Sequence, residues 1–359
     1  MLQFPKLYFS DGAMKIPKFH LDRIFKELEI EEIDAVESAV LPQPLITTDV
    51  QKLEIEDTEK QPDQARFLGS EIASYPLNDL AAIVFYRLHN KLLLHSITPS
   101  ELESKLILPA GKGFAEAFAD KISFDLQTFA AQHRYEISKS HVIQHPGVKD
   151  PILILSAVGF RPATEADDTF LLRSGLKLIV LNSLAPVPIL LLTELYGEKI
   201  RYNFDPEFYK WCRELDYEAH ISGKSFMKFR KKFPSPGKYY LMGEGGVAAC
   251  SYNLVKNYGV GVEIDLEKLP MFTTTKLLCD LFRLDPLCID ATGSLLAALD
   301  ERSCEELLTL CTERNIPATV VGELTDSHTD CLFTNYDDNK LRMFNPDFDE
   351  LHRFRYDLL

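Results

Sequence analysis

The chain has 359 residues, of which 46% are hydrophobic and 26% are charged, a composition typical of an ordinary globular protein. Its 39 Lys and Arg residues face 54 Asp and Glu residues, which gives a formal net charge of -15. Because nucleic-acid binders and anionic-membrane binders need a basic surface, this balance argues against both classes. It still allows a locally basic pocket for a phosphorylated small molecule. The length predicts two domains, each able to bury its own core.

The sequence also indicates the compartment. The first residues show no basic region leading into an apolar core, so we expect no secretory signal. The most apolar stretch, residues 176–195, is interrupted by Lys177, two prolines and Glu194, so we expect no membrane span. All seven cysteines lie in the C-terminal half without a Cys-x-x-Cys pair. This odd, unclustered set predicts reduced core thiols in a cytoplasmic protein.

The first half reads as an alternation of strands and helices. Apolar positions from Arg66 onward fall near helical spacing, which predicts a helix that Pro76 interrupts. The acidic residues 53–63 predict a surface loop. The other predicted elements are strands at residues 42–50, 91–97, 135–143 and 151–160 and a helix at residues 113–133.

A polar segment at residues 161–168 divides the chain into predicted domains of residues 1–165 and 166–359. In the second half Asp205 and Pro206 form a helix start, and Gly259 ends a helix. The predicted strands cover residues 176–182, 238–242, 260–265, 294–299 and 318–324. The predicted helices cover residues 187–195, 206–221, 225–233, 247–258, 274–283 and 301–315.

Two acidic residues, Asp49 and Asp79, could support phosphate chemistry. Asp49 ends a predicted strand, and Asp79 follows Asn78 in a helical segment. Together their oxygens could hold Mg²⁺ beside the phosphates of a nucleotide. The alternative is structural: Asp49 simply ends its strand, and the Asn78-Asp79 pair caps a helix. Spacing alone favours this second interpretation.

A possible base or ligand pair is formed by His141 and His145, four residues apart on one predicted strand. Single histidines are more often ordinary surface or core groups, so this hypothesis stays open beside the structural one.

A glycine turn at residues 243–246 joins a predicted strand to a predicted helix. Such a turn can bring backbone N–H groups and the helix dipole to an anion. Tight turns use glycine for steric reasons at least as often. The sequence contains no Walker-type phosphate loop and no Gly-x-Ser-x-Gly or His-Glu-x-x-His motif.

The second half resembles the aminoimidazole ribonucleotide synthetase-like superfamily. This group includes the hydrogenase-maturation carbamoyl-dehydrating protein, selenophosphate synthetase and thiamine monophosphate kinase. The hydrogenase-maturation branch and its uncharacterised relatives look closest. The blocks that carry the resemblance occur in family order at residues 243–248, 259–265, 269–270, 284–287, 292–296, 316–324 and 349–353.

The first half is similar to the same family at fewer positions. Residues 45–49 resemble a strand that ends in a metal-binding aspartate, and residues 78–82 resemble an Asn-Asp helix at the nucleotide site. The resemblance implies a two-domain α+β fold. Its N-terminal sheet domain would serve dimerisation, and its C-terminal domain would be an α/β sandwich. ATP and Mg²⁺ would lie between the domains, near the interface of a homodimer. The implied site residues are Asp49 and Asp79 for the metal and Asp34, Asn78, Gly243, Gly245 and Gly246 for ATP, with no catalytic residue assigned.

Several family features are missing. The glycine-rich acidic loop is replaced by the segment around Asp34, which has no glycine, and residues 138–141 replace a Gly-Gly-(Asp/His)-Thr segment. The turn before Gly245 lacks the family's aspartate and threonine. No Pro-Arg-x-Cys tail is visible, and because the hydrogenase-maturation reaction needs that cysteine as carbamoyl acceptor, we expect no carbamoyl-dehydrating activity. His141 could replace a lost ligand.

Two functional interpretations follow. In the first, the protein is an ATP-dependent enzyme that phosphorylates or activates an oxygen of an unidentified small substrate. In the second, the scaffold is a catalytically degenerate nucleotide-sensing or structural dimer that acts through a protein partner. The retained Asp49 and Asn78-Asp79 favour the first, and the eroded loops favour the second.

Overall fold

The structure is a computed structural model of the whole chain. It describes residues 51–53, 64–75, 77–110, 115–162, 170–223, 237–335, 337, 339–344, 346 and 349–352. The predicted strand at residues 42–50, most of the predicted acidic loop and the predicted helix at residues 225–233 lie outside this part.

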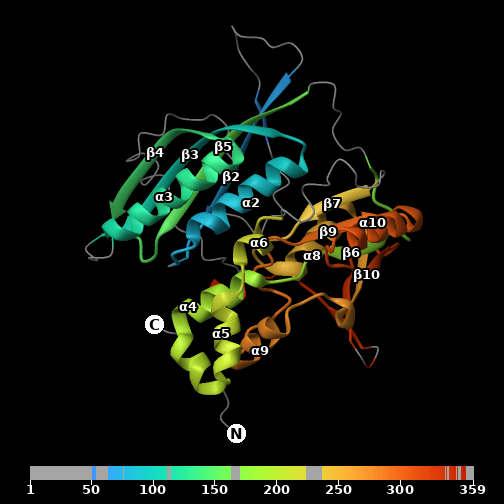
Figure 1. Cartoon of the computed structure of the whole chain (residues 1–359). Coiled ribbons are helices and arrows are strands. Elements are labelled where there is room, and N and C mark those ends of the chain that lie inside the picture. The colour runs from blue at the N-terminus through green and yellow to red at the C-terminus, as the bar shows by residue number, and fades with distance from the viewer. Residues whose placement is uncertain are drawn as a thin grey trace.

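The first half forms a five-stranded sheet with the order β1-β2-β5-β3-β4. Its neighbouring strands are antiparallel except for the parallel pair β3 and β4. The helices α2 (Leu80–Leu94) and α3 (Ala115–His133) cover one face (Figure 1). The strands are β1 (Gln51–Leu53), β2 (Gln64–Ala73), β3 (Thr98–Pro109), β4 (Glu136–His145) and β5 (Ile152–Pro162).

Two sequence predictions in this half are wrong. The segment from Arg66 is the strand β2, in which Phe67, Gly69 and Ala73 are buried with a period of two. Its apolar residues also fit a helical period, so the pattern was ambiguous over so short a run. The predicted strand at residues 91–97 is the last turn of α2 and the connection to β3.

The second half forms a seven-stranded sheet with the order β12-β11-β8-β10-β6-β9-β7. Only β8 and β11 pair in parallel among its described strands. The strands are β6 (Lys177–Leu181), β7 (Gly237–Leu241), β8 (Gly261–Asp265), β9 (Leu295–Leu299), β10 (Ala318–Thr325), β11 (Cys331–Thr334) and β12 (Lys340–Arg342). The central strands are apolar at nearly every position because both faces of the sheet are covered.

Helices cover this sheet on its two sides. The helix α10 (Glu301–Glu313) packs on the face that carries Ile179 and Leu295, whereas Leu178 and Leu296 point into the larger core on the other face. The other helices are α4 (Pro186–Asn203), α5 (Pro206–Glu214), α6 (Tyr217–Ile221), α8 (Gly246–Tyr258), α9 (Thr273–Phe282) and the short η2 (Leu266–Lys268).

Helix ends confirm the local sequence signals. Asp205 accepts a hydrogen bond from the Phe208 N–H at 2.8 Å and so caps α5. Gly259 adopts a left-handed conformation with φ of 62° and ends α8, as its position predicted.

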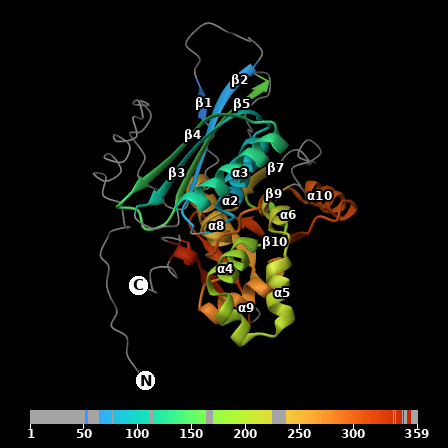
Figure 2. The ribbon, with the colours of Figure 1, turned by 60° about the vertical axis from the view of Figure 1, so that its left-hand side comes forward.

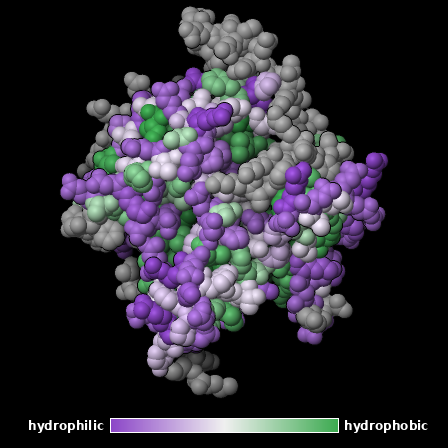
Figure 3. All heavy atoms as spheres, in the orientation of Figure 1, coloured by the Kyte–Doolittle hydropathy of each residue, from purple (hydrophilic) through white to green (hydrophobic). Residues whose placement is uncertain are grey.

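The helix α2 lies between the five-stranded sheet and the second half (Figure 2). Almost all of its residues are buried, and one continuous core cluster contains apolar residues of both halves. The face of the molecule in Figure 3 is mostly hydrophilic, with hydrophobic residues in scattered patches. Within the described ranges, no helix has the length and apolar character that crossing a membrane requires.

Candidate functional site

The predicted nucleotide residues lie at the junction of the two halves where the structure describes them. Asp34 and Asp49 lie outside the described residues. Asn78 and Asp79 immediately precede α2, and the glycine turn precedes α8.

Asp79 stands at the N-cap position immediately before α2, but its side chain does not cap the helix. Its backbone dihedrals are φ -92° and ψ 13°, and its carboxylate accepts no hydrogen bond from the first turn of the helix. Burial is the main cause that raises the pKa of this carboxyl group, with Asp125 adding to the shift and Lys121 opposing it. The capping interpretation therefore does not describe this side chain, whose oxygens remain available to a ligand.

Asn78 ties this end of α2 to α4. Its backbone N–H and its Nδ2 both donate to Glu194 Oε1, at 3.3 and 2.7 Å. Burial raises the pKa of Glu194, and the neighbouring Asp79 raises it further, while the hydrogen bonds from Asn78 oppose the shift. Sequence reasoning did not select Glu194, although an acidic residue inside the apolar run of α4 was a visible signal.

The glycine turn is shaped by close backbone packing. Gly245 and Gly246 both adopt left-handed conformations, with φ of 73° and 59°. A Cβ atom at Gly246 would lie 2.4 Å from the Ile289 carbonyl oxygen, so only glycine fits there. Gly243 has no neighbouring atom within 4 Å of such a Cβ position. The steric reason for glycine thus applies to Gly246 and not to Gly243.

The backbone amides that begin α8 have partners within the chain. The Gly245 N–H donates to Asp349 Oδ2 at 2.7 Å, and the Gly246 N–H donates to the Gly243 carbonyl at 3.1 Å. Asp349 thus places a carboxyl group of the chain where the sequence predicted a phosphate. The assignment of these glycines to ATP stays a prediction.

A buried cation connects the halves next to this turn. Arg87 of α2 forms an ion pair with Asp290 in the loop before β9 and a second one with Glu244 at 2.9 Å. Its Nε donates to Thr292 Oγ1 at 2.9 Å. Tyr75, in the loop before α2, donates from its hydroxyl group to Asp290 Oδ2 at 3.3 Å.

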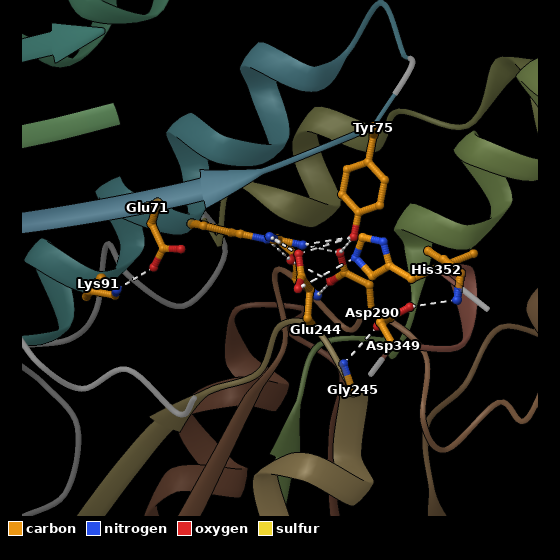
Figure 4. A network of polar contacts seen from close by, with 11 residues as sticks. Glu71, Tyr75, Lys91, Glu244, Gly245, Asp290, Asp349 and His352 are labelled. Atoms are coloured by element: carbon orange, nitrogen blue, oxygen red, sulfur yellow. Dashed lines mark hydrogen bonds and ion pairs between the residues drawn. The ribbon is translucent and has the colours of Figure 1, made fainter. Parts of the chain in front are cut away.

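The C-terminal residues complete this group. The His352 ring stacks on Tyr75 with 5.6 Å between the ring centroids, and its Nε2 lies 3.8 Å from Glu244 Oε2 (Figure 4). We call the set of Tyr75, Arg87, Glu244, Asp290, Thr292, Asp349 and His352 the Arg87 cluster.

The charges of the Arg87 cluster shift its carboxyl groups in opposite directions. Burial opposes the ionisation of Glu244, yet the charge of Arg87 and the contact with His352 lower its pKa to about 2. Burial raises the pKa of Asp349 well above its ordinary range, and the charges of Asp290 and Glu244 raise it further. Glu244 and Asp290 therefore balance the charge of Arg87, and the carboxyl group of Asp349 lies in a negative environment.

Sequence reasoning missed most of this cluster. Arg87 is one of two positive charges, with Lys91, within the mostly apolar α2, and a charge at such a position signals a buried ion pair. Asp290 and Tyr75 carry no comparable signal, because their proximity to Arg87 depends on the tertiary fold. Asp349 belongs to the last block of the family resemblance.

The histidine pair does not join the site residues. His141 is exposed on the edge strand β4, opposite Lys105 of β3, and the His145 ring accepts a hydrogen bond from the Gly147 N–H at 3.1 Å. Within the described ranges, no group of three or more His, Cys, Asp or Glu side chains forms a metal site.

Comparison with known proteins agrees with the family expectation. Residues 242–333 match the model of the family described as AIR synthase related protein, C-terminal domain. A putative hydrogenase expression/formation protein of Methanocaldococcus jannaschii is 20% identical over 256 residues, which cover 71% of this chain and 72% of that protein.

Solved structures show the same fold over most of the chain. The hydrogenase maturation protein HypE of E. coli has a TM-score of 0.59 and 17% identity, covering 78% of this chain and 86% of that one. HypE in complex with ATP has a TM-score of 0.60 and 14% identity, covering 85% of this chain and 91% of that one. Thiamine monophosphate kinase of Aquifex aeolicus has a TM-score of 0.54 and 16% identity, covering 91% of this chain and 99% of that one. The chain therefore has the mixed α and β fold of HypE and thiamine monophosphate kinase, and its residues 242–333 match the AIR synthase related C-terminal domain.

Proposed function

We propose that this protein binds ATP with Mg²⁺ at the start of α2 and uses it to phosphorylate or activate an oxygen of a small substrate. The observation that carries the proposal is Asp79, a half-buried carboxylate that forms no capping hydrogen bond at a helix start between the two halves. Structures of similar fold support it, because one is HypE in complex with ATP and another is the kinase ThiL complexed with AMPPCP and TMP.

The donor groups fit magnesium. Mg²⁺ in nucleotide sites usually takes one or two protein carboxylates together with phosphate oxygens, so a cluster of three protein ligands is not required. Asp79 would be one ligand, and Asp49 is proposed as the second. A bound cation would relieve the mutual repulsion of Asp79 and Glu194, which the structure places close enough to raise the pKa of Glu194.

The chain's own residues would mainly orient the nucleotide and hold the metal ion. Mg²⁺ would supply charge neutralisation of the phosphates. Asn78 lies beside Asp79 and could turn its amide from Glu194 to the nucleotide, which would couple ATP to α4. Gly243 has open space where a Cβ atom would lie and could admit a phosphate there, whereas the Gly245 N–H is engaged by Asp349.

Thermal unfolding with and without Mg-ATP tests the proposal. A ligand present at 100 times its Kd adds about 2.7 kcal/mol to the folded state, which is visible as a higher Tm. We expect this shift to disappear with EDTA and in Asp79→Ala and Asp49→Ala. Asp205→Ala is the matched control, since Asp205 caps α5 and its loss should lower the Tm without changing the Mg-ATP shift. No shift at millimolar Mg-ATP in the wild type would overturn the proposal.

A non-catalytic function is the second candidate. The engagement of the Gly245 amide by Asp349 favours a scaffold that senses nucleotide or acts through a protein partner. A HypE–HypF complex exists among the structures of similar fold. Mg-ATP binding without ADP release, over a panel of small carboxylates, amides and phosphates, would support this candidate over the first.

We further propose a cytoplasmic homodimer. The face of the five-stranded sheet opposite α2 and α3 carries partly exposed apolar side chains, among them Leu68, Ile72, Ile154 and Val158. Such a face is suited to pairing with a second copy. All seven cysteines are free thiols and six are buried, which supports a reducing compartment.

A further inference from the structure

The C-terminal residues Asp349–His352, here named the strap, are fastened to the second half at three points. Asp349 accepts hydrogen bonds from the N–H groups of Gly245 and Leu351, at 2.7 and 2.9 Å. Glu350 donates its N–H to the Cys288 carbonyl at 3.1 Å. Leu351 is fully buried in the core. The strap therefore covers the beginning of α8.

The strap also reaches the first half. His352 stacks on Tyr75 in the loop before α2 and lies beside Glu244, which is itself paired with Arg87. A segment of four residues thus contacts both halves at their junction.

The charges around the strap are not balanced. Arg87 forms ion pairs with Glu244 and Asp290, and its guanidinium is occupied by them. Asp349 is 2% exposed and, among the described residues, has no cationic partner within ion-pair distance. Three carboxyl groups therefore converge near one guanidinium, and the one on the strap is left without an opposite charge.

We propose that the strap is a pH-sensitive device, seated on the Arg87 cluster while Asp349 holds a proton and released when Asp349 ionises. The seated strap buries this group beside two negative charges, whereas the released strap exposes it to water. The seated state therefore binds the proton more tightly, and its stability is lost as the pH rises through the raised pKa of Asp349. Release would free the Gly245 N–H at the start of α8.

The other groups that face Asp349 constrain this device. Glu244, with a pKa of about 2, is ionised throughout the neutral range, and burial keeps the hydroxyl of Tyr75 protonated. Arg87 stays charged. Asp290 forms an ion pair with Arg87 in the seated state. The Nε2 atom of His352 lies 3.8 Å from Glu244 Oε2, so the test includes a variant that removes the His352 ring.

Hydrogen exchange measured by mass spectrometry tests the proposal on the full chain. The observed regions are the strap and residues 245–249, compared at a series of pH values over the range in which the protein stays folded, after correction for intrinsic exchange. One linked proton can change protection by up to about tenfold per pH unit, so we expect protection of both regions to fall together as the pH rises.

The side chain in Asp349→Asn cannot ionise, so the protection of the strap and of residues 245–249 should be independent of pH in this variant. The loss of one acceptor oxygen can lower that protection at every pH without making it depend on pH. Asp300→Asn is the matched control, because Asp300 caps α10 by accepting from Ser303 at 2.8 Å and lies outside the Arg87 cluster. It should keep the wild-type pH dependence of the strap.

Two further variants keep the proposal testable if Asp349→Asn does not fold. Glu244→Gln removes one neighbouring negative charge and so lowers the pKa of Asp349 in the seated state, which should make the pH-dependent loss of protection smaller and end it at lower pH. His352→Gln should retain the pH dependence. The proposal would be overturned if the pH dependence of protection persisted in Asp349→Asn, vanished in His352→Gln or stayed unchanged in Glu244→Gln. Wild-type protection that does not vary with pH would also overturn it.

Discussion

Arg87 and Asp290 form a buried ion pair that joins α2 of the first half to the loop before β9 of the second. Asp290 is fully buried and also accepts hydrogen bonds from the Thr292 N–H and hydroxyl group at 2.8 and 2.6 Å. The pair is therefore held in place on both sides, and its geometry depends on the correct seating of the two halves.

Arg87→Met should destabilise the protein strongly. It leaves the carboxylates of Asp290 and Glu244 without their cation, and breaking a buried ion pair in this way costs about 3–5 kcal/mol. Chemical denaturation measures the change. Arg302→Met removes an exposed i,i+4 pair with Glu306 and should change stability by no more than about 0.5 kcal/mol. Equal effects of the two variants would contradict the structural role of Arg87.

Gly246→Ala and Gly243→Ala should differ sharply. The methyl group at residue 246 would meet two backbone carbonyls at a positive φ, which we expect to cost at least about 1–3 kcal/mol. At residue 243 the same methyl group meets open space, so stability should stay near the wild-type value. Mg-ATP affinity of the folded variants then shows whether Gly243 contacts phosphate.

Stability at acid pH should depend on Glu244. Its pKa is depressed in the folded state, so its contribution is present above its ordinary range and is lost as the pH falls from about 4.5 to about 2. Glu244→Gln should flatten this part of the stability profile, measured by urea denaturation at several pH values. The exposed Glu306→Gln should leave the profile unchanged. A wild-type profile without an acid limb would exclude this role for Glu244.

Ile72→Arg should give a monomer if the open sheet face is the dimer interface. Ile72 is 47% exposed on the face opposite α2 and α3, and a charge there would be buried on association. Light scattering at micromolar concentration measures the mass. Leu171→Arg, at a position that is 83% exposed outside the sheet, should leave the dimer intact. A wild type that is monomeric would reject the proposed homodimer.

The sequence was most informative where local chemistry decides the structure. The caps at Asp205 and Gly259 and the glycine turn before α8 were recognisable because each depends on a few neighbouring residues. The strand β2 was mistaken for a helix because its short apolar run fits two periods, and long-range pairing with β5 selects the strand.

The candidate site divides in the same way. Asn78 and Asp79 were singled out from their place in the sequence and assigned to the nucleotide site through the family resemblance, and the structure adds that the Asp79 side chain does not cap its helix. Glu194, Arg87 and Asp290 depend on contacts between residues more than a hundred positions apart, which no local pattern encodes. Asp349 was recognised as part of a sequence block, but its contact with Gly245 required the fold.

The burial of α2 has a consequence for any attempt to divide this protein. Because one core cluster contains residues of both halves, a fragment ending near residue 165 would expose apolar side chains of α2 that now meet the second half. Such a fragment should be prone to aggregation, and the complementary fragment would lack the cation that balances Glu244 and Asp290. Gene fusion or recombination would therefore have to carry both halves together for the product to stay folded.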